Sequence, residues 1–104
     1  MAKHTNQSSS GTSFYGIEFS ATPQKLIDLF PDSFYSQNNG MDKSNFDFTL
    51  ETEDGNVFTI YDWKEYRPLE MNEVVEWHIG GFNEQTCLQG KVEVLTLLNK
   101  LQTA

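Results

Sequence analysis

Two neighbouring segments, 45–52 and 56–63, alternate apolar and polar residues on either side of a short turn that contains Asp54 and Gly55. An alternation with a period of two is typical of β-strands that bury one face, and Asp-Gly between two such runs is a strong hairpin signal. This hairpin constrains the fold more than any other stretch, because its register decides which side chains enter the core.

The length of the turn sets that register. A two-residue turn would pair Leu50 with Thr59, whereas a three-residue loop with Gly55 in the left-handed conformation pairs Leu50 with Phe58. Only the longer loop gathers the apolar side chains on one face, since a slip of one residue moves every side chain to the other face. We therefore predict the three-residue loop, with these side chains facing the core: Phe46, Phe48, Leu50, Phe58 and Ile60.

Two further segments, 13–20 and 74–81, also alternate like strands. Gly16 in the first of them indicates a bulge or a close approach of the backbone. In the second segment, Trp77 and the apolar residues two positions away on each side are assigned to the core. The sequence therefore predicts four strands.

Helix start signals occur twice. Thr22 is a good N-cap and Pro23 suits the first helical position, which predicts a short helix. Asn83 or Thr86 is expected to cap the last helix, whose first turn is predicted to fray because Gly90 costs about 1 kcal/mol relative to Ala. The order β-α-β-β-β-α predicts an α+β fold, an antiparallel four-stranded sheet with helices packed on one face.

The length of 104 residues is typical of one domain. Residues 1–12 are polar and of low complexity, so we expect a flexible tail followed by a single α+β domain over 13–104. One cysteine, Cys87, excludes an internal disulfide. Because the sequence has neither a long apolar run nor the pattern of a signal peptide, we expect a soluble, cytoplasmic protein.

The formal net charge is −8, and most of it lies between residues 42 and 76. Such a field repels duplex nucleic acid and anionic membranes, so neither is expected as a partner. Two interpretations of the acidic residues remain open. They keep the surface solvated, or they form a face that binds a basic protein, in the extreme case by mimicking nucleic acid.

If the helices cover one face of the sheet, the other face carries large amphipathic rings beside hydrogen-bonding groups. Such a mixture suits stacking on a planar ligand or a protein interface. Three interpretations remain open: a second packing layer covered by the 31–44 loop or the tail, a homo-oligomer interface, and a ligand site. The residues concerned are Asp47, Thr59, Tyr61, Trp63, Glu76 and His78.

Lys64 and Arg67 interrupt the acidic stretch and are candidates for holding a phosphate, to which Gly80 and Gly81 would add backbone N–H groups. His78 is expected to be a hydrogen-bonded structural histidine, since no third ligand has the spacing of a metal site. No nucleophile-plus-base pair or catalytic motif is present, so we expect neither an enzyme nor a cofactor.

Two segments, Thr-Ile-Tyr-Asp-Trp-Lys at 59–64 and Glu-Trp-His-Ile-Gly-Gly at 76–81, resemble the paired signatures of a family of small bacteriophage proteins. Phage proteins of this size without an enzyme motif often counter host defence. They sequester a nucleotide-derived immune signal, commonly within an oligomer, or they bind a host protein directly. The resemblance therefore implies an anti-defence binding protein that acts in the bacterial host cytoplasm as a homo-oligomer.

Together these observations favour a protein that sequesters a small nucleotide-derived ligand. An acidic inhibitor that binds a host defence protein through its carboxylates is the alternative, and a structural role in assembly is a third. The sequence predicts no catalytic or metal-binding residue. The predicted ligand contacts are Tyr61, Trp63, Lys64, Arg67 and His78.

Overall fold

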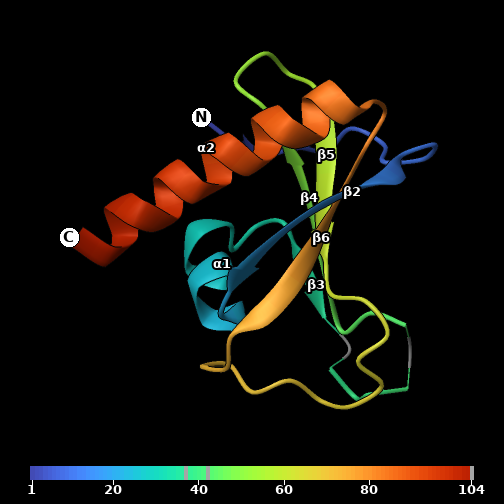
Figure 1. The fold of residues 1–104 in the computed structure, drawn as a ribbon, viewed down its shortest axis with the longest axis vertical. Helices are drawn as coiled ribbons and strands as arrows, with labels where there is room; N and C mark the ends of the chain where they lie inside the picture. Colours follow the sequence, from blue (N-terminus) through green and yellow to red (C-terminus); the bar gives the residue numbers. More distant parts are fainter. Residues whose placement is uncertain (37, 42, 104) are drawn as a thin grey trace.

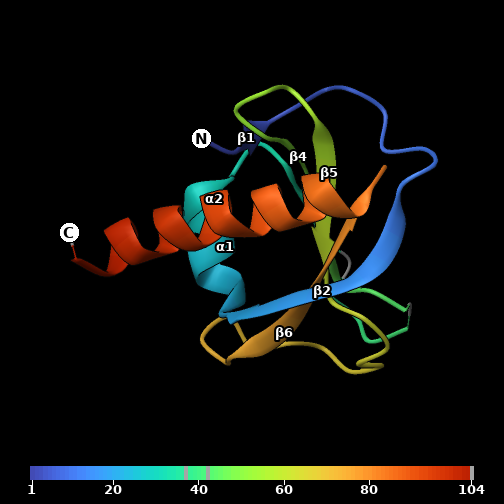
Figure 2. The same ribbon diagram turned by 45° about the horizontal axis from the view of Figure 1, so that its top comes forward.

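The computed structural model describes residues 1–36, 38–41 and 43–103 (Figure 1). Their fold is a mixed α/β fold in which an antiparallel sheet carries both helices on one face (Figures 1 and 2). The strands are β1 (Lys3–His4), β2 (Ser13–Ala21), β3 (Phe34–Ser36), β4 (Phe46–Glu51), β5 (Val57–Tyr61) and β6 (Val75–Gly81), and the helices are α1 (Pro23–Leu29) and α2 (Glu84–Thr103).

Within the described residues the sheet has six strands, so the prediction of four strands was wrong. The strand order is β1-β4-β5-β6-β2, and β3 also pairs with β4. Strand β1 lies in the predicted flexible tail, 1–12, and β3 lies in the predicted loop, 31–44. Both strands are too short for a periodic pattern to reveal them, and their extended form comes from pairing with the edge of β4.

The central hairpin has the predicted register. Leu50 lies opposite Phe58, and Phe48 lies opposite Ile60. Gly55 has a φ of 83°, the left-handed conformation that the three-residue loop requires, and its N–H donates to the carbonyl oxygen of Thr52 (2.8 Å). The five side chains predicted to face the core are all buried, so the pattern of apolar residues fixes this register as expected.

Trp77 lies at the centre of the core, between the sheet and the helices. Its ring makes edge-on contacts with Phe46 and Phe48, and its indole N–H donates to the carbonyl oxygen of Ala21 (3.0 Å). This bond satisfies the one polar group that burial of the ring would otherwise leave without a partner. The prediction that this face of β6 enters the core is confirmed.

Both helices begin where the sequence predicts. The Thr22 side chain accepts a hydrogen bond from the N–H of Lys25, and the Asn83 side chain accepts one from the N–H of Thr86 (2.8 Å). The predicted fraying at Gly90 is not observed, because α2 is continuous from Glu84. A Cβ atom at Gly90 would lie 2.8 Å from the ring of Phe58, so the glycine lets the helix approach the sheet closely.

Strand β2 contains the predicted bulge at Gly16, which has a φ of 83°. Phe14 pairs with Gly80 and Glu18 pairs with His78, so β2 uses two more residues than β6 over the same length. The bulge therefore brings Phe14 closer to His78 than a regular strand would. Over the part of the chain that the structure describes, no helix has the length and apolar character needed to cross a membrane.

Candidate functional site

The face of the sheet opposite the helices, here called the outer face, carries a row of polar and aromatic residues across five strands. Paired residues on neighbouring antiparallel strands point to the same side of a sheet, so the register alone places the row. From β3 to β2 the row consists of Tyr35, Asp47, Tyr61, His78 and Glu18.

An aromatic cluster, defined as Phe14, Tyr61, Trp63 and His78, covers the part of the outer face over β5 and β6. The His78 ring stacks on Phe14 at a centroid distance of 4.1 Å and an angle of 10°, and it lies 6.2 Å from Trp63 at 28°. Tyr61 meets both His78 and Trp63 edge-on. Four rings from three separate segments thus form one continuous surface, as the sequence predicted for three of them.

Glu18 fixes the orientation of the His78 ring. Its Oε1 lies 2.8 Å from Nε2 of His78, directly across the β2–β6 pair. The prediction of a hydrogen-bonded histidine is confirmed. The structure describes no group of three metal-ligating side chains in residues 1–36, 38–41 and 43–103. The contact with Glu18 and the stacking on Phe14 hold the His78 ring in place within the aromatic cluster.

Two lysines lie beside Trp63, whose side chain is 40% exposed. The ammonium nitrogens of Lys43 and Lys64 are 5.8 Å and 5.5 Å from the centre of the Trp63 ring, within the range of cation–π contacts. Among the described residues, neither ammonium group has a carboxylate within 4.0 Å. These two positive charges stand next to an aromatic face in a protein whose net charge is −8.

The backbone around Lys64 joins two loops and is held in an uncommon conformation. The N–H of Lys64 donates to the carbonyl oxygen of Lys43 (2.6 Å), which couples the two lysine-bearing segments. Lys64 and Tyr66 have φ values of 55° and 51°, in the left-handed region that residues with a Cβ seldom adopt. Such strain persists where the surroundings enforce it, and it is concentrated at binding sites.

The side chain of Asp62, the residue after β5, holds the end of this strand from the interior of the protein. This fully buried carboxylate accepts hydrogen bonds from the backbone N–H groups of Asn45 and Phe46 (both 2.8 Å) and from the Asn45 side chain (3.0 Å). Because the next residues are Trp63 and Lys64, this arrangement holds the start of the 63–73 loop in a fixed position. Asp62 thus has a structural role in supporting the site.

Asp47 is one of the two acidic members of the row, beside Glu18. Although Asp47 is exposed, partial desolvation by its neighbours raises its pKa from 3.8 to about 6, with a further contribution from the Asp62 carboxylate, while a hydrogen bond from the Phe48 N–H acts in the opposite direction. Burial and the neighbouring Asp47 also raise the pKa of Tyr61. The outer face therefore stabilises the ionised form of Asp47 less well than water does.

Arg67 binds another residue of its own loop. Its two terminal nitrogens donate to the two carboxylate oxygens of Glu73 at 2.8 Å and 2.7 Å, a bidentate pair. The hydrogen bond from Arg67 lowers the pKa of Glu73 to about 2. A role of Arg67 in ligand binding remains a prediction, and it would require this pair to open.

Gly80 and Gly81, whose N–H groups were candidates for holding a phosphate, lie inside the sheet. Both lie in β6, paired with β5 on one side and β2 on the other. A Cβ atom would lie 2.7 Å from Oγ1 of Thr59 at Gly80, and 2.7 Å from Sγ of Cys87 at Gly81. The two glycines therefore permit close packing under the aromatic cluster and against α2.

The structure thus brings together four of the five predicted contacts and adds residues that the sequence did not single out as contacts. Phe14 lies in the strand predicted from the sequence, but only the bulge in β2 brings its ring to His78. Lys43 sits in a loop without periodicity, so no sequence signal pointed to it. The added residues are Phe14, Glu18, Lys43 and Asp47.

Comparisons of this chain with protein-family models, with curated protein sequences and with solved structures found no match.

Proposed function

We propose that this protein binds, without catalysis, a small ligand that combines a planar ring with a phosphate, as a nucleotide does. The observation that carries the proposal is the exposed face of Trp63 with the ammonium groups of Lys43 and Lys64 beside it. The Trp63 ring suits a flat ring of the ligand, and the two ammonium groups beside it suit an anionic group on the same ligand.

The ring of the ligand stacks on Trp63, an interaction worth about 1–3 kcal/mol per base in proteins that bind single-stranded nucleic acid. The phosphate accepts charge-assisted hydrogen bonds from Lys43 and Lys64, which have no carboxylate partner in the described part of the chain. Tyr61 and His78 extend the aromatic surface on which the ligand rests.

The binding elements are already in place, which favours affinity. The Lys64–Lys43 backbone bond and the buried Asp62 carboxylate hold the two loops together. Preorganisation reduces the entropy that is lost when the ligand binds. Combined with the resemblance to small phage proteins, this supports sequestration of a nucleotide-derived immune signal in the bacterial cytoplasm, an activity that needs tight binding and no chemical step.

A second candidate function is the direct inhibition of a basic host defence protein. It is favoured by the tip of the β4–β5 hairpin, where Glu53 and Asp54 are exposed, in a chain of net charge −8. This function predicts salt-sensitive binding that is lost on charge reversal at Glu53 and Asp54. Under the first proposal, the same charge reversal leaves ligand binding unchanged.

The test is a titration of the protein with a panel of mononucleotides and cyclic dinucleotides. Tryptophan fluorescence and calorimetry monitor the binding. Trp77 is fully buried, so the fluorescence of Trp63 is the signal that a ligand on the outer face changes. We expect Trp63→Ala and Lys43→Ala each to weaken binding about tenfold or more, a loss of at least about 1.4 kcal/mol.

The matched control is Lys25→Ala, which removes the same charge from α1 on the opposite side of the sheet. Equal affinities for the wild type, Trp63→Ala and Lys43→Ala would refute this site. If no nucleotide of the panel binds while a host protein is captured in a salt-sensitive manner, the second function is favoured instead.

A further inference from the structure

Helix α2 carries a second apolar stripe that does not face the core. Its buried side chains include Val94 and Leu98, as expected for a helix on a sheet. Leu88, Val92 and Leu95 follow at steps of four and three residues on another side of the helix and are exposed, Val92 to 64%. A stripe of this regularity is unlike the scattered apolar residues of an ordinary surface.

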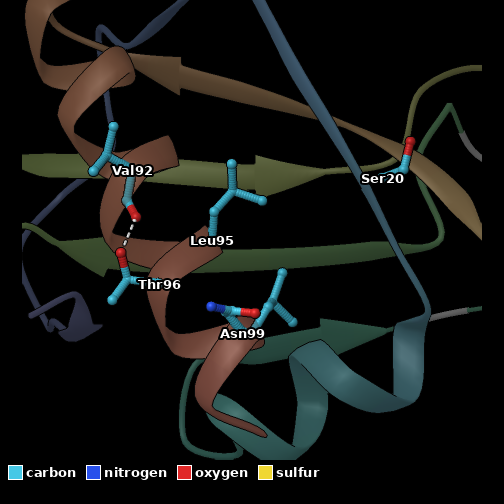
Figure 3. Close-up of a pocket in the computed structure, with 6 residues that line it drawn as sticks. Ser20, Val92, Leu95, Thr96 and Asn99 are labelled. Carbon is cyan, nitrogen blue, oxygen red and sulfur yellow. Dashed lines mark hydrogen bonds between the residues drawn. The ribbon is translucent and has the colours of Figure 1, made fainter. Parts of the chain in front are cut away.

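A groove of about 530 Å³ runs between this stripe and strand β2. Figure 3 shows Val92, Leu95, Thr96 and Asn99 along the helix, with Ser20 on β2 across from them. The residues that line the groove are uncharged. In the views of Figures 1 and 2, α2 crosses the sheet and its C-terminal end extends beyond it.

Strand β2 is the last strand in the order of the sheet. One side of it pairs with β6, and no strand among the described residues pairs with the other side. Edge strands of monomeric proteins are usually blunted by lysine, proline or inward-pointing charge, because their free N–H and C=O groups pair with other chains. A β-bulge also blunts an edge, and β2 has one at Gly16. The regular part of the edge is therefore the stretch after the bulge, up to Ala21, which has no lysine or proline and whose single charged residue, Glu18, is bonded to His78.

We propose that a second copy of this chain binds here, through antiparallel pairing of β2 with the partner's β2 and contact between the two exposed stripes of α2. A strand pairs antiparallel with its own copy about a two-fold axis, so one patch serves both partners. The result is a continuous sheet with the two α2 helices side by side on one face. Homo-oligomerisation was expected from the sequence, which offered the outer face as one of the open interpretations for the interface and did not point to this edge.

The size of the patch suits a stable dimer. A standard interface buries about 800 Å² per partner, a modest part of the 5757 Å² that the chain exposes. Because of its bulge, β2 spans only the length of the 7 residues of β6 with which it pairs, about 23 Å, and one sheet layer together with one helix is about 20 Å thick, which gives a flat footprint of about 460 Å². The accessible area of a grooved surface exceeds its flat footprint, so the patch approaches the standard value.

The charge distribution also favours a second copy at this place. Two chains of net charge −8 repel each other, so only a surface with little charge permits their close approach. The stripe residues and those lining the groove are uncharged, and β2 adds only Glu18. Salt screens the repulsion between copies, and the dimer should therefore tighten as ionic strength rises. A basic partner on the acidic surface would show the opposite dependence.

The test is analytical ultracentrifugation of the full chain and of three glutamate variants. We expect a species of twice 11.9 kDa for the wild type and at least tenfold weaker association for Val92→Glu. Met41→Glu is the matched control, because Met41 is 79% exposed in the loop before β4 and lies outside the patch. Circular dichroism establishes that each variant is folded, and Leu88→Glu provides an independent disruption of the stripe.

Hydrogen exchange gives a second readout. Backbone amides on the free side of β2 should exchange slowly in the wild type and quickly in Val92→Glu, at equal protein concentration. A wild-type monomer at about 100 µM, the weak end of specific association, would overturn the proposal. So would a dimer that Val92→Glu and Leu88→Glu leave intact, or a monomer whose groove holds a co-purified small molecule.

Discussion

Replacement of Asp47 by Asn should stabilise the protein at neutral pH. Asp47 lies between Tyr35 and Tyr61 on the neighbouring strands, and the Asp62 carboxylate repels it. Partial desolvation and this repulsion raise its pKa from 3.8 to about 6, so the folded state binds the proton more tightly than the unfolded state does. The contribution of Asp47 to the free energy of unfolding is therefore fully present below pH 3.8, and it is lost as the pH rises through about 6.

The magnitude follows from the same shift. The difference between the two pKa values corresponds to about 3 kcal/mol at full strength. Because the Asp47 side chain keeps contact with water, solvent screening reduces the effect, and we expect a gain of about 1 kcal/mol for Asp47→Asn at pH 7.5. The gain should be small at pH 4 and disappear as the pH falls well below 3.8, where Asp47 is protonated in both the folded and the unfolded state.

Urea unfolding at pH 7.5 and pH 4, with buried Trp77 as the fluorescence reporter, measures this difference. Asp32→Asn removes the same charge from an exposed position and should change the stability little at either pH. The substitution at Asp47 also removes a negative charge from the outer face, so affinity for a phosphate-bearing ligand should rise. A stability gain that is equal at both pH values, or a loss at pH 7.5, would refute the reasoning.

Two further substitutions test the packing under the helix and the strained loop. Gly90→Ala should lower the free energy of unfolding by about 1 kcal/mol or more, because the new Cβ meets the buried ring of Phe58 at 2.8 Å and this outweighs the better helix propensity of alanine. Chemical denaturation measures the loss. Adding Phe58→Leu to the same chain should recover part of it. Lys64→Gly should raise the stability by about 0.5–1 kcal/mol, because glycine adopts the φ of 55° without strain, while calorimetry should show weaker ligand binding. The same change at Lys25 within α1 should instead cost about 1 kcal/mol, and a loss of stability at both positions would contradict this account of the loop.

The elements that could be predicted from the sequence are those with a periodic pattern long enough to fix a register. In the central hairpin, five apolar side chains and Gly55 agree on a single pairing, and the structure has that pairing. The bulge at Gly16 and the cap at Thr22 each follow from the conformational properties of one residue. Local chemistry was sufficient in these cases.

What the sequence did not predict depends on contacts between distant segments. The strands β1 and β3 have two and three residues, and only the edge of β4 makes them extended. Lys43 reaches Trp63 because the carbonyl group of Lys43 accepts a hydrogen bond from the N–H of Lys64. The spacing of these residues along the chain does not predict this contact. The bidentate pair of Arg67 with Glu73 depends on how their loop folds, so the sequence alone does not predict it.

The binding of a nucleotide-like ligand by Trp63 and Lys43 is tested most directly with a natural mixture of small molecules. The wild type and a Trp63→Ala/Lys43→Ala double variant are incubated with the small-molecule extract of phage-infected bacterial cells and examined by native mass spectrometry. We expect the wild type to retain a phosphate-containing species of nucleotide size and the double variant to retain none. If both proteins stay bare, or both retain the same species, Trp63 and Lys43 are not the binding surface.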